Sequence, residues 1–152
     1  MEIGEGVTSI GKNAFAGMTA VQGAFPLPST IQAIGASAFE NAGFYSEELN
    51  LPTGLRELGT AAFRGCDGIV KLTIPGGVKE IPDSAFYNCG GITVVTLKDG
   101  IEEIGGNAFN GCNALQSLKL SENIKEIGGY AFSGCTHLQR LALTEGLERI
   151  GA

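Results

Sequence analysis

The sequence predicts a β-rich, right-handed repeat solenoid, in which one short unit recurs along the chain and each copy packs on the next. An Ala-Phe pair recurs with intervals of 24, 24, 23, 23 and 23 residues between successive phenylalanines. Aliphatic residues precede each phenylalanine by five and by eight residues and keep the same register. A fixed period of this length is typical of solenoids, because one unit cannot bury its own apolar face. The phenylalanine column comprises Phe15, Phe39, Phe63, Phe86, Phe109 and Phe132.

The segment after each phenylalanine carries an LxxLxL pattern that predicts a short strand, as at Leu115, Leu118 and Leu120. Strands from successive units should form a parallel sheet at about 4.8 Å per unit. The last complete unit repeats the pattern at Leu138, Leu141 and Leu143. The first two intervals are one residue longer, which places a local bulge before the strand and puts these apolar pairs on it: Phe25 with Leu27, and Leu49 with Leu51.

The AFxxC segment predicts a single helical or 3₁₀ turn between the strands. Within such a turn the Phe and the Cys lie three residues apart and share one inward face. Two residues before the phenylalanine stands a short polar side chain that could cap the turn. The capping candidates are Asn13, Ser37, Ser84 and Asn107.

Cysteines occur once per unit, 23 residues apart, in a column that Met18 and Ala42 occupy earlier in the chain. A column that accepts Met and Ala requires apolar volume. A shared zinc centre is excluded, because zinc holds its sulfurs about 2.3 Å from one point whereas these thiols lie on successive units. Neighbouring Cα atoms are close enough for a disulfide, but parallel side chains keep the Cβ atoms too far apart. We expect free, buried thiols at Cys66, Cys89, Cys112 and Cys135.

The complete pattern, LxxLxLPxxLxxIGxxAFxxC, is represented by LTIPGGVKEIPDSAFYNC (72–89) and LKLSENIKEIGGYAFSGC (118–135). It resembles the BspA-like class of leucine-rich repeats over essentially the whole chain. The departures are Pro82, which replaces the usual Gly, and the Met and Ala in the cysteine column. The resemblance implies a leucine-rich-repeat fold and a non-catalytic binding module of a cell-surface or secreted protein, which recognises protein or glycan partners outside the cell.

Composition narrows the classes of partner. A net charge of −6 and a pI near 4.7 disfavour nucleic acid and anionic membrane surfaces. No apolar run approaches the length of a membrane span, and the first ten residues lack the features of a signal peptide. The only histidine, His137, has no nucleophile or acid fixed beside it. We therefore expect no enzyme activity, no cofactor, no metal site and no membrane insertion.

Two charged columns follow the upstream aliphatic residues. Lys79, Glu102, Lys125 and Glu148 alternate in sign, which should help to fix the register between units. The next column is a stripe of glutamates that ends in Arg149. Either this stripe binds a cation or a basic ligand, or it is a solvated surface screened by adjacent Lys and Arg side chains. The stripe is Glu57, Glu80, Glu103 and Glu126.

The outward strand positions are the expected partner-binding face, because a solenoid presents there a broad and regularly spaced surface. Lys71, Lys119 and Arg140 are the candidate contacts on this face. The irregular segment NAGFYSEE (41–48) adds Phe44 and Tyr45, although Tyr45 falls where regular units bury an apolar residue. The alternative is a structural spacer or scaffold with no ligand of its own.

The chain reads as a single domain, 1–152, of about six and a half repeats. It opens on a strand pattern and stops at ERIGA, just before the next Ala-Phe, without polar capping segments. Exposed end units of a solenoid favour stacking. We therefore expect either a piece of a longer repeat protein or self-association through the uncapped end repeats.

Overall fold

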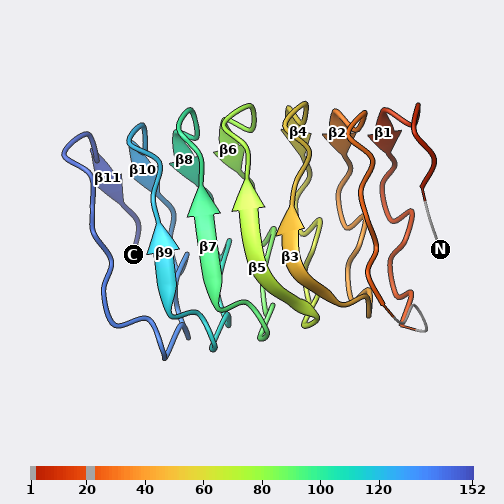
Figure 1. The fold of residues 1–152 in the computed structure, drawn as a ribbon. Coiled ribbons are helices and arrows are strands. Elements are labelled where there is room, and N and C mark those ends of the chain that lie inside the picture. Colours follow the sequence, from red (N-terminus) through yellow and green to blue (C-terminus); the bar gives the residue numbers. More distant parts are fainter. Residues whose placement is uncertain (1–2, 20–22) are drawn as a thin grey trace.

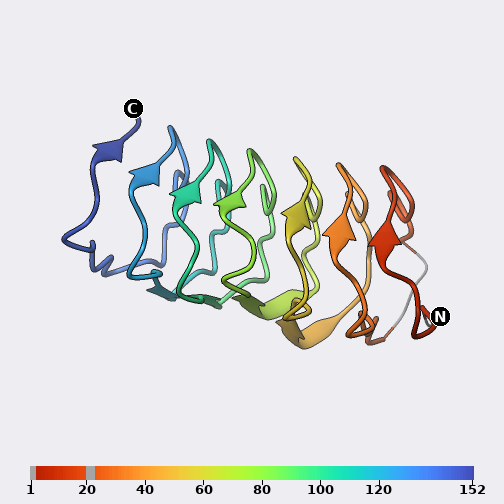
Figure 2. The ribbon, with the colours of Figure 1, turned by 90° about the horizontal axis from the view of Figure 1, so that it is seen from above.

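The computed structural model, which describes residues 3–19 and 23–152, is a parallel-strand solenoid of about six turns, or coils (Figure 1). We number coils 1 to 6 by their phenylalanines, from Phe15 to Phe132. Successive coils lie side by side along one axis, with the described ends at opposite ends of it (Figure 2). The described residues contain strands and turns but no helix, and therefore no helix able to cross a bilayer.

Coils 2 to 5 each contribute one longer and one very short strand, coils 1 and 6 contribute a very short strand only, and these strands stack into three parallel sheets. The main sheet has the order β3-β5-β7-β9, formed by Ser46–Asn50, Ile69–Ile74, Val94–Leu97 and Ser117–Lys119. On another side of the coils, β1 (Ser9–Ile10), β2 (Ala33–Ile34) and β4 (Glu57–Leu58) form a second sheet. The third sheet has the order β11-β10-β8-β6, formed by Arg149–Ile150, Glu126–Ile127, Glu103–Ile104 and Glu80–Ile81.

The interruption between β4 and β6 coincides with Pro82. In other coils the glycine at this position donates its N–H to the backbone carbonyl oxygen of an aliphatic residue in the previous coil. Gly59 donates to Ile34 at 2.8 Å and Gly105 donates to Ile81 at 2.7 Å. Proline has no N–H, so the equivalent bond to Leu58 cannot form. This departure from the repeat pattern therefore divides one ladder into two sheets.

The AFxxC segments form consecutive hydrogen-bonded turns in place of the expected helical or 3₁₀ turn. In coil 3, the N–H of Ala62 donates to the carbonyl oxygen of Gly59 in the same coil, whereas the N–H of Phe63 donates to the carbonyl oxygen of Ala85 in the next coil at 2.9 Å. Successive N–H groups thus alternate between a hydrogen bond within the turn and a hydrogen bond to the neighbouring coil. This stack of turns acts as a further hydrogen-bonded layer between coils.

The predicted capping role of the residues two before each phenylalanine is wrong. All six positions have left-handed backbones, with φ between 52° and 58°. Asn and Ser suit this position because short polar side chains tolerate the left-handed conformation. The Ser84 hydroxyl donates to Asp83, not to a backbone group. The column is Asn13, Ser37, Ala61, Ser84, Asn107 and Tyr130.

The phenylalanine column is a continuous ring stack at the centre of the core. Neighbouring rings from Phe39 to Phe132 have centroids 5.0 to 5.8 Å apart and lie within 11° of parallel. Phe63, Phe86 and Phe109 are completely buried. Each ring therefore packs on both neighbouring coils, and the stack fixes the coil spacing.

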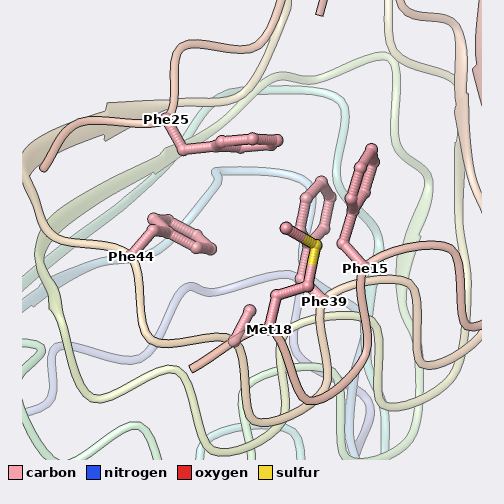
Figure 3. Close-up of a pocket in the computed structure, with 6 residues that line it drawn as sticks. Phe15, Met18, Phe25, Phe39 and Phe44 are labelled. Carbon is pink, nitrogen blue, oxygen red and sulfur yellow. The ribbon is translucent and has the colours of Figure 1, made fainter. Parts of the chain in front are cut away.

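Two additional aromatic rings fill the core where the cysteine column changes to Met18 and Ala42 (Figure 3). Phe25 and Phe44 lie 5.8 Å apart and make edge contacts with the ring of Phe39 at 5.6 and 5.9 Å. Between these side chains remains a void of only about 10 Å³. In the longer early coils, Phe25 and Phe44 thus supply apolar volume that the cysteines supply later.

Two strands expected from the LxxLxL pattern do not form. Residues 24–28 include Phe25 and Leu27 and leave β3 unpaired on that side, since Pro26 and Pro28 have no N–H to donate. Residues 138–143 carry Leu138, Leu141 and Leu143 but stay outside the sheet, which ends at β9. Among the described residues, coil 6 pairs with the following turn only through β10 and β11, and its segment 138–143 has a neighbouring strand on one side only, so pairing there buries less apolar surface.

Candidate functional site

The outward side chains of the main sheet form two aligned rows, which we call the outer sheet face. Cα register places Glu48 beside Lys71, followed by Val94 and Ser117, and it places Asn50 beside Thr73, followed by Thr96 and Lys119. Lys71, Ser117 and Lys119 are exposed. The register follows from the inward Leu, Ile and Val residues, because a slip of one residue would reverse both faces.

Tyr45 and Lys71 are brought together at one end of this face by Glu47. The Tyr45 hydroxyl donates to Glu47 at 2.7 Å, and the Lys71 ammonium lies 3.7 Å from the other oxygen of the same carboxylate. This hydrogen bond and the negative charge of Glu47 raise the pKa of Tyr45. Half of Tyr45 is exposed, so its ring offers apolar area beside a paired cation.

Phe44 is not available on any surface, and its selection as a contact residue is wrong. Its side chain is 2% exposed, while Tyr45, expected in a buried column, is 50% exposed. The extra residue of this coil lies before Ser46, which pairs with Ile69. That placement turns Phe44 inward and Tyr45 outward.

Lys119 and Arg140 lie at the other end of the outer sheet face, beside two grooves. One groove of about 510 Å³ includes Lys119 in its lining, and the other, of about 370 Å³, includes Arg140. Both side chains are exposed, and among the described residues neither makes an ion pair. The five sequence candidates therefore separate into one buried residue and two surface groups.

A third group, formed by Glu40, Arg64 and Tyr87, was missed in the sequence. The Arg64 guanidinium lies 5.1 Å from the centroid of the Tyr87 ring and 3.8 Å from Glu40. The three occupy equivalent positions one residue after the phenylalanine in successive coils. Arg and Tyr are the residue types most enriched in interface hot spots, and comparing this column would have identified them.

The cysteine thiols are buried hydrogen-bond donors. Sγ of Cys66, Cys89 and Cys112 lies 2.9, 3.0 and 3.3 Å from the carbonyl oxygen of the phenylalanine in the previous coil. Burial raises the pKa of Cys66 to about 12 and that of Cys112 to about 12, which keeps both thiols protonated. Half-buried Cys135 has its pKa raised to about 11 for the same reason. Thiolate is the nucleophilic form, so these cysteines are poor nucleophiles.

Other chemistry-bearing side chains are engaged in structural contacts. Nδ1 of His137 lies 2.6 Å from the carbonyl oxygen of Asn113, which it satisfies as a donor. Within the described residues, no three His, Cys, Asp or Glu side chains gather in a way that could hold a metal ion.

The alternating charged column forms one of the expected ion pairs between coils, whereas Lys79 donates to the carbonyl oxygen of Gly100 instead of pairing with Glu102. Lys125 donates to Glu102 at 2.7 Å, and Arg149 is paired with Glu126. The hydrogen bond from Lys125 lowers the pKa of Glu102. Desolvation, followed by the charges of Glu80 and Glu126, raises the pKa of Glu103 in the middle of the glutamate stripe.

Comparison with protein families identifies the repeat. The model of the BspA type leucine rich repeat region matches residues 1–89 and 42–152, with six copies of the repeat. A search of curated proteins finds no match.

Solved structures with the same fold are also leucine-rich-repeat proteins. The chain is 32% identical to a T. pallidum leucine rich repeat protein, over 97% of this chain and 69% of that one, with a TM-score of 0.85. A leucine-rich repeat protein from Eubacterium ventriosum gives a TM-score of 0.88 at 22% identity and covers 99% of this chain. A leucine rich cell surface protein from Faecalibacterium prausnitzii is 26% identical, with a TM-score of 0.54 over 98% of this chain.

The chain spans only 40% of the length of the E. ventriosum protein and 48% of the F. prausnitzii protein. The family model, by contrast, accounts for every coil of this chain, including those that contain Met18, Ala42 and Pro82. The chain therefore belongs to the BspA-type leucine-rich-repeat family.

Proposed function

We propose that the chain is a non-catalytic binding module of a cell-surface or secreted protein, and that it recognises protein or glycan partners through the outer sheet face. The observation that carries the proposal is the group of exposed cations on and beside this face, with Lys71 and Lys119 on the sheet and Arg140 on the segment after β9, on a chain whose net charge is −6. Positive side chains on a rigid sheet suit carboxylate or sulfate groups of a partner.

The rigidity of the sheet supports this role. Its inward residues are buried on both neighbouring coils, so the exposed side chains are held at regular spacings without a cost of ordering the backbone on binding. Lys71 and Lys119 lie two strands and two residues apart, or about 12 Å, a span that a disaccharide or a short peptide covers. The similar F. prausnitzii protein is described as a cell surface protein, which supports the same location here.

A retention assay on defined coats tests the proposal. The purified chain is passed over immobilised mucin and over a mixed extracellular-matrix coat, together with the triple variant Lys71→Glu, Lys119→Glu and Arg140→Glu. We expect the triple variant to lose retention, because three cations become anions on the binding face.

The matched control carries the same charge change on other surfaces, as Lys12→Glu, Lys79→Glu and Lys98→Glu. We expect this control to retain binding. An equal loss of retention in both triple variants would show that the effect depends on net charge and not on the outer sheet face. If the parent chain is retained on neither coat, the result would favour the alternative of a structural spacer.

A further inference from the structure

The outer edge of β9 lacks a strand partner in the part of the chain that the structure describes. The main sheet ends at this strand, with β7 on one side only. The segment that follows in the next coil, 139–143, forms no backbone hydrogen bond, although its flanks rejoin the solenoid: Leu138 N–H donates to Cys135 and Glu148 N–H donates to Lys125. In regular coils the same positions are bonded, as Thr93 N–H is to Val70 and Gln116 N–H to Thr93. Coil 6 thus lacks backbone hydrogen bonds to coil 5 only in the segment that would extend the main sheet.

The separation produces a slot between two polypeptide walls. The grooves of about 510 and 370 Å³ share Leu118 and Ala142 in their linings and are therefore continuous. Their combined size is in the range of ligand-binding pockets. We call this space, between 116–120 and 139–145, the β9 slot.

Both walls of the β9 slot keep their backbone donors and acceptors. Residues 116–120 and 139–145 contain no proline, unlike 24–28 at the opposite end of the sheet, where Pro26 and Pro28 remove donors. Unpaired N–H and C=O groups along an open edge are a template for another extended chain. The slot thus offers strand pairing on both sides at once.

We propose that the β9 slot binds an extended peptide segment of a partner protein, inserted as an added strand between β9 and residues 139–143. The proposal rests on the proposed binding function and specifies the partner class as protein. Backbone pairing supplies affinity that does not depend on sequence, and the slot's side chains select among peptides.

The side chains around the slot define the peptide it fits. Leu118 and Leu120 on one wall, and Leu143 on the other, suit apolar residues two apart on the inward side of the peptide, and Leu143 is already 50% exposed. On the outward side, Lys119 and Arg140 flank the space from opposite walls and lack ion-pair partners among the described residues. Glu122 and Glu145 line the far end of the larger groove. The complementary peptide therefore alternates aliphatic and acidic residues opposite the two cations and is uncharged at the end that faces the two glutamates.

The probe is a fluorescein-labelled, N-acetylated and C-amidated peptide with the sequence Ser-Ile-Glu-Ile-Glu-Ile-Ser, titrated with the full chain by fluorescence anisotropy. We expect saturable binding. The same peptide with N-methyl groups on its central residues should not bind, because it cannot pair with the walls, and a Lys-for-Glu peptide should bind about five- to tenfold more weakly.

Variants of the chain locate the binding site. Lys119→Glu with Arg140→Glu should weaken binding of the acidic peptide about five- to tenfold and improve that of the Lys peptide. The control variant Lys12→Glu with Lys79→Glu changes the charge by the same amount away from the slot, and it should leave the affinity for both peptides unchanged. Ala142→Pro removes one unbonded N–H from the slot wall and should weaken binding without lowering thermal stability.

Hydrogen exchange of the free chain decides whether the slot is open. We expect the amides of 139–143 to exchange faster than those of β7. Protection of the 139–143 amides equal to that of β7 would mean that the slot is closed. Protection that rises with protein concentration would identify a second copy of the chain as the occupant. In the peptide titration, equal binding of the N-methylated peptide would exclude strand pairing. Each of these three results overturns the proposal. If the chain is not retained on the mucin and matrix coats but still binds the peptide, the result contradicts the proposed function of the outer sheet face and leaves the β9 slot proposal standing.

Discussion

At the residue scale, the cysteine column illustrates how a repeated reactive residue becomes structural. Cys112 lies below Phe109 in the ring stack and donates its S–H to the carbonyl of Phe86. The sequence predicted burial correctly, because Met18 and Ala42 occupy the same column. It did not predict the S–H···O bond, since an apolar column gives no indication of a carbonyl within reach.

The buried thiols should make the fold sensitive to alkaline pH. The pKa of Cys66 and of Cys112 is raised to about 12 from an ordinary value of 9.0, and that of Cys89 is also raised. Above pH 9 the unfolded chain releases these protons while the folded chain holds them, so the free energy of unfolding falls as pH rises towards 12. Below pH 9 this contribution is constant. Urea titrations under reducing conditions at pH 7 to 10.5 measure it.

The control for the alkaline effect is the triple variant Cys66→Ala, Cys89→Ala and Cys112→Ala. Alanine is accepted in this column at Ala42, and the variant retains all Tyr and Lys groups that titrate in the same range. We expect a shallower loss of stability above pH 9 in the variant. The same pH dependence in both proteins would show that the thiols are not responsible.

A second residue-scale prediction concerns the left-handed column two residues after each phenylalanine. Gly111 has φ 78°, and an added Cβ would lie 2.9 Å from Asn88 Oδ1 and 3.3 Å from Asn88 Cα. We expect Gly111→Ala to lower the free energy of unfolding by about 1–3 kcal/mol. Gly111→Asn should cost less, because Asn41 and Asn88 hold this conformation in other coils.

Gly17→Ala separates backbone strain from crowding, since Gly17 has φ 70° but open space around its missing Cβ. In chemical denaturation, Gly111→Ala should lose more free energy of unfolding than Gly17→Ala. A neutral Gly111→Ala would contradict the left-handed turn. The sequence contained this signal, because the column consists only of Gly and Asn, from Gly17 to Gly134.

At the element scale, the ring stack should carry much of the stability of each coil. Phe86 is fully buried and stacks at 5.4 Å on the rings of both neighbouring coils. Phe86→Ala removes contacts with coils on both sides and should lower the free energy of unfolding by about 3–5 kcal/mol. Guanidinium titrations followed by circular dichroism measure the loss.

Phe132→Ala is the matched variant in the last coil. Phe132 is only partly buried and stacks on the ring of Phe109 alone, among the described residues. We expect a loss of about half or less, because one ring contact and part of the burial are missing. If Phe132→Ala cost as much as Phe86→Ala, the stack would not determine the stability of the coils.

The strands show where the periodic pattern predicts elements well and where it fails. The apolar pattern predicted the strands of coils 2 to 5 because inward residues on both neighbours support them, as at Leu72 and Val95. It failed at 24–28, where prolines remove donors, and at 138–143, where the segment has a neighbouring strand on one side only. A pattern of side chains does not report how many neighbours a coil has.

At the scale of the whole molecule, the period alone determines the architecture, whereas the candidate site depends on local departures from it. Lys71, Lys119 and Arg140 were placed correctly on exposed positions because they follow the inward alternation. Phe44 and Tyr45 exchanged roles because the position of a one-residue insertion within a coil is decided by packing against Phe25 and Phe39. The slot beside β9 was not predictable because the LxxLxL pattern is intact at 138–143, and a pattern of side chains does not report whether the segment has neighbours to pair with.

Deletion of one complete coil tests the central claim, that each unit is an interchangeable layer that specifies shape. Removing 90–112, which is 23 residues, joins Cys89 to Asn113, a junction equivalent to the native Cys112 to Asn113. We expect the shortened chain to keep its β-sheet circular dichroism and a cooperative denaturant transition at lower stability, because stability in a solenoid is a sum over units and interfaces. Removing 90–101 breaks the register and should abolish the transition. Loss of cooperative unfolding in the in-register deletion, equal to that in the out-of-register one, would contradict the account.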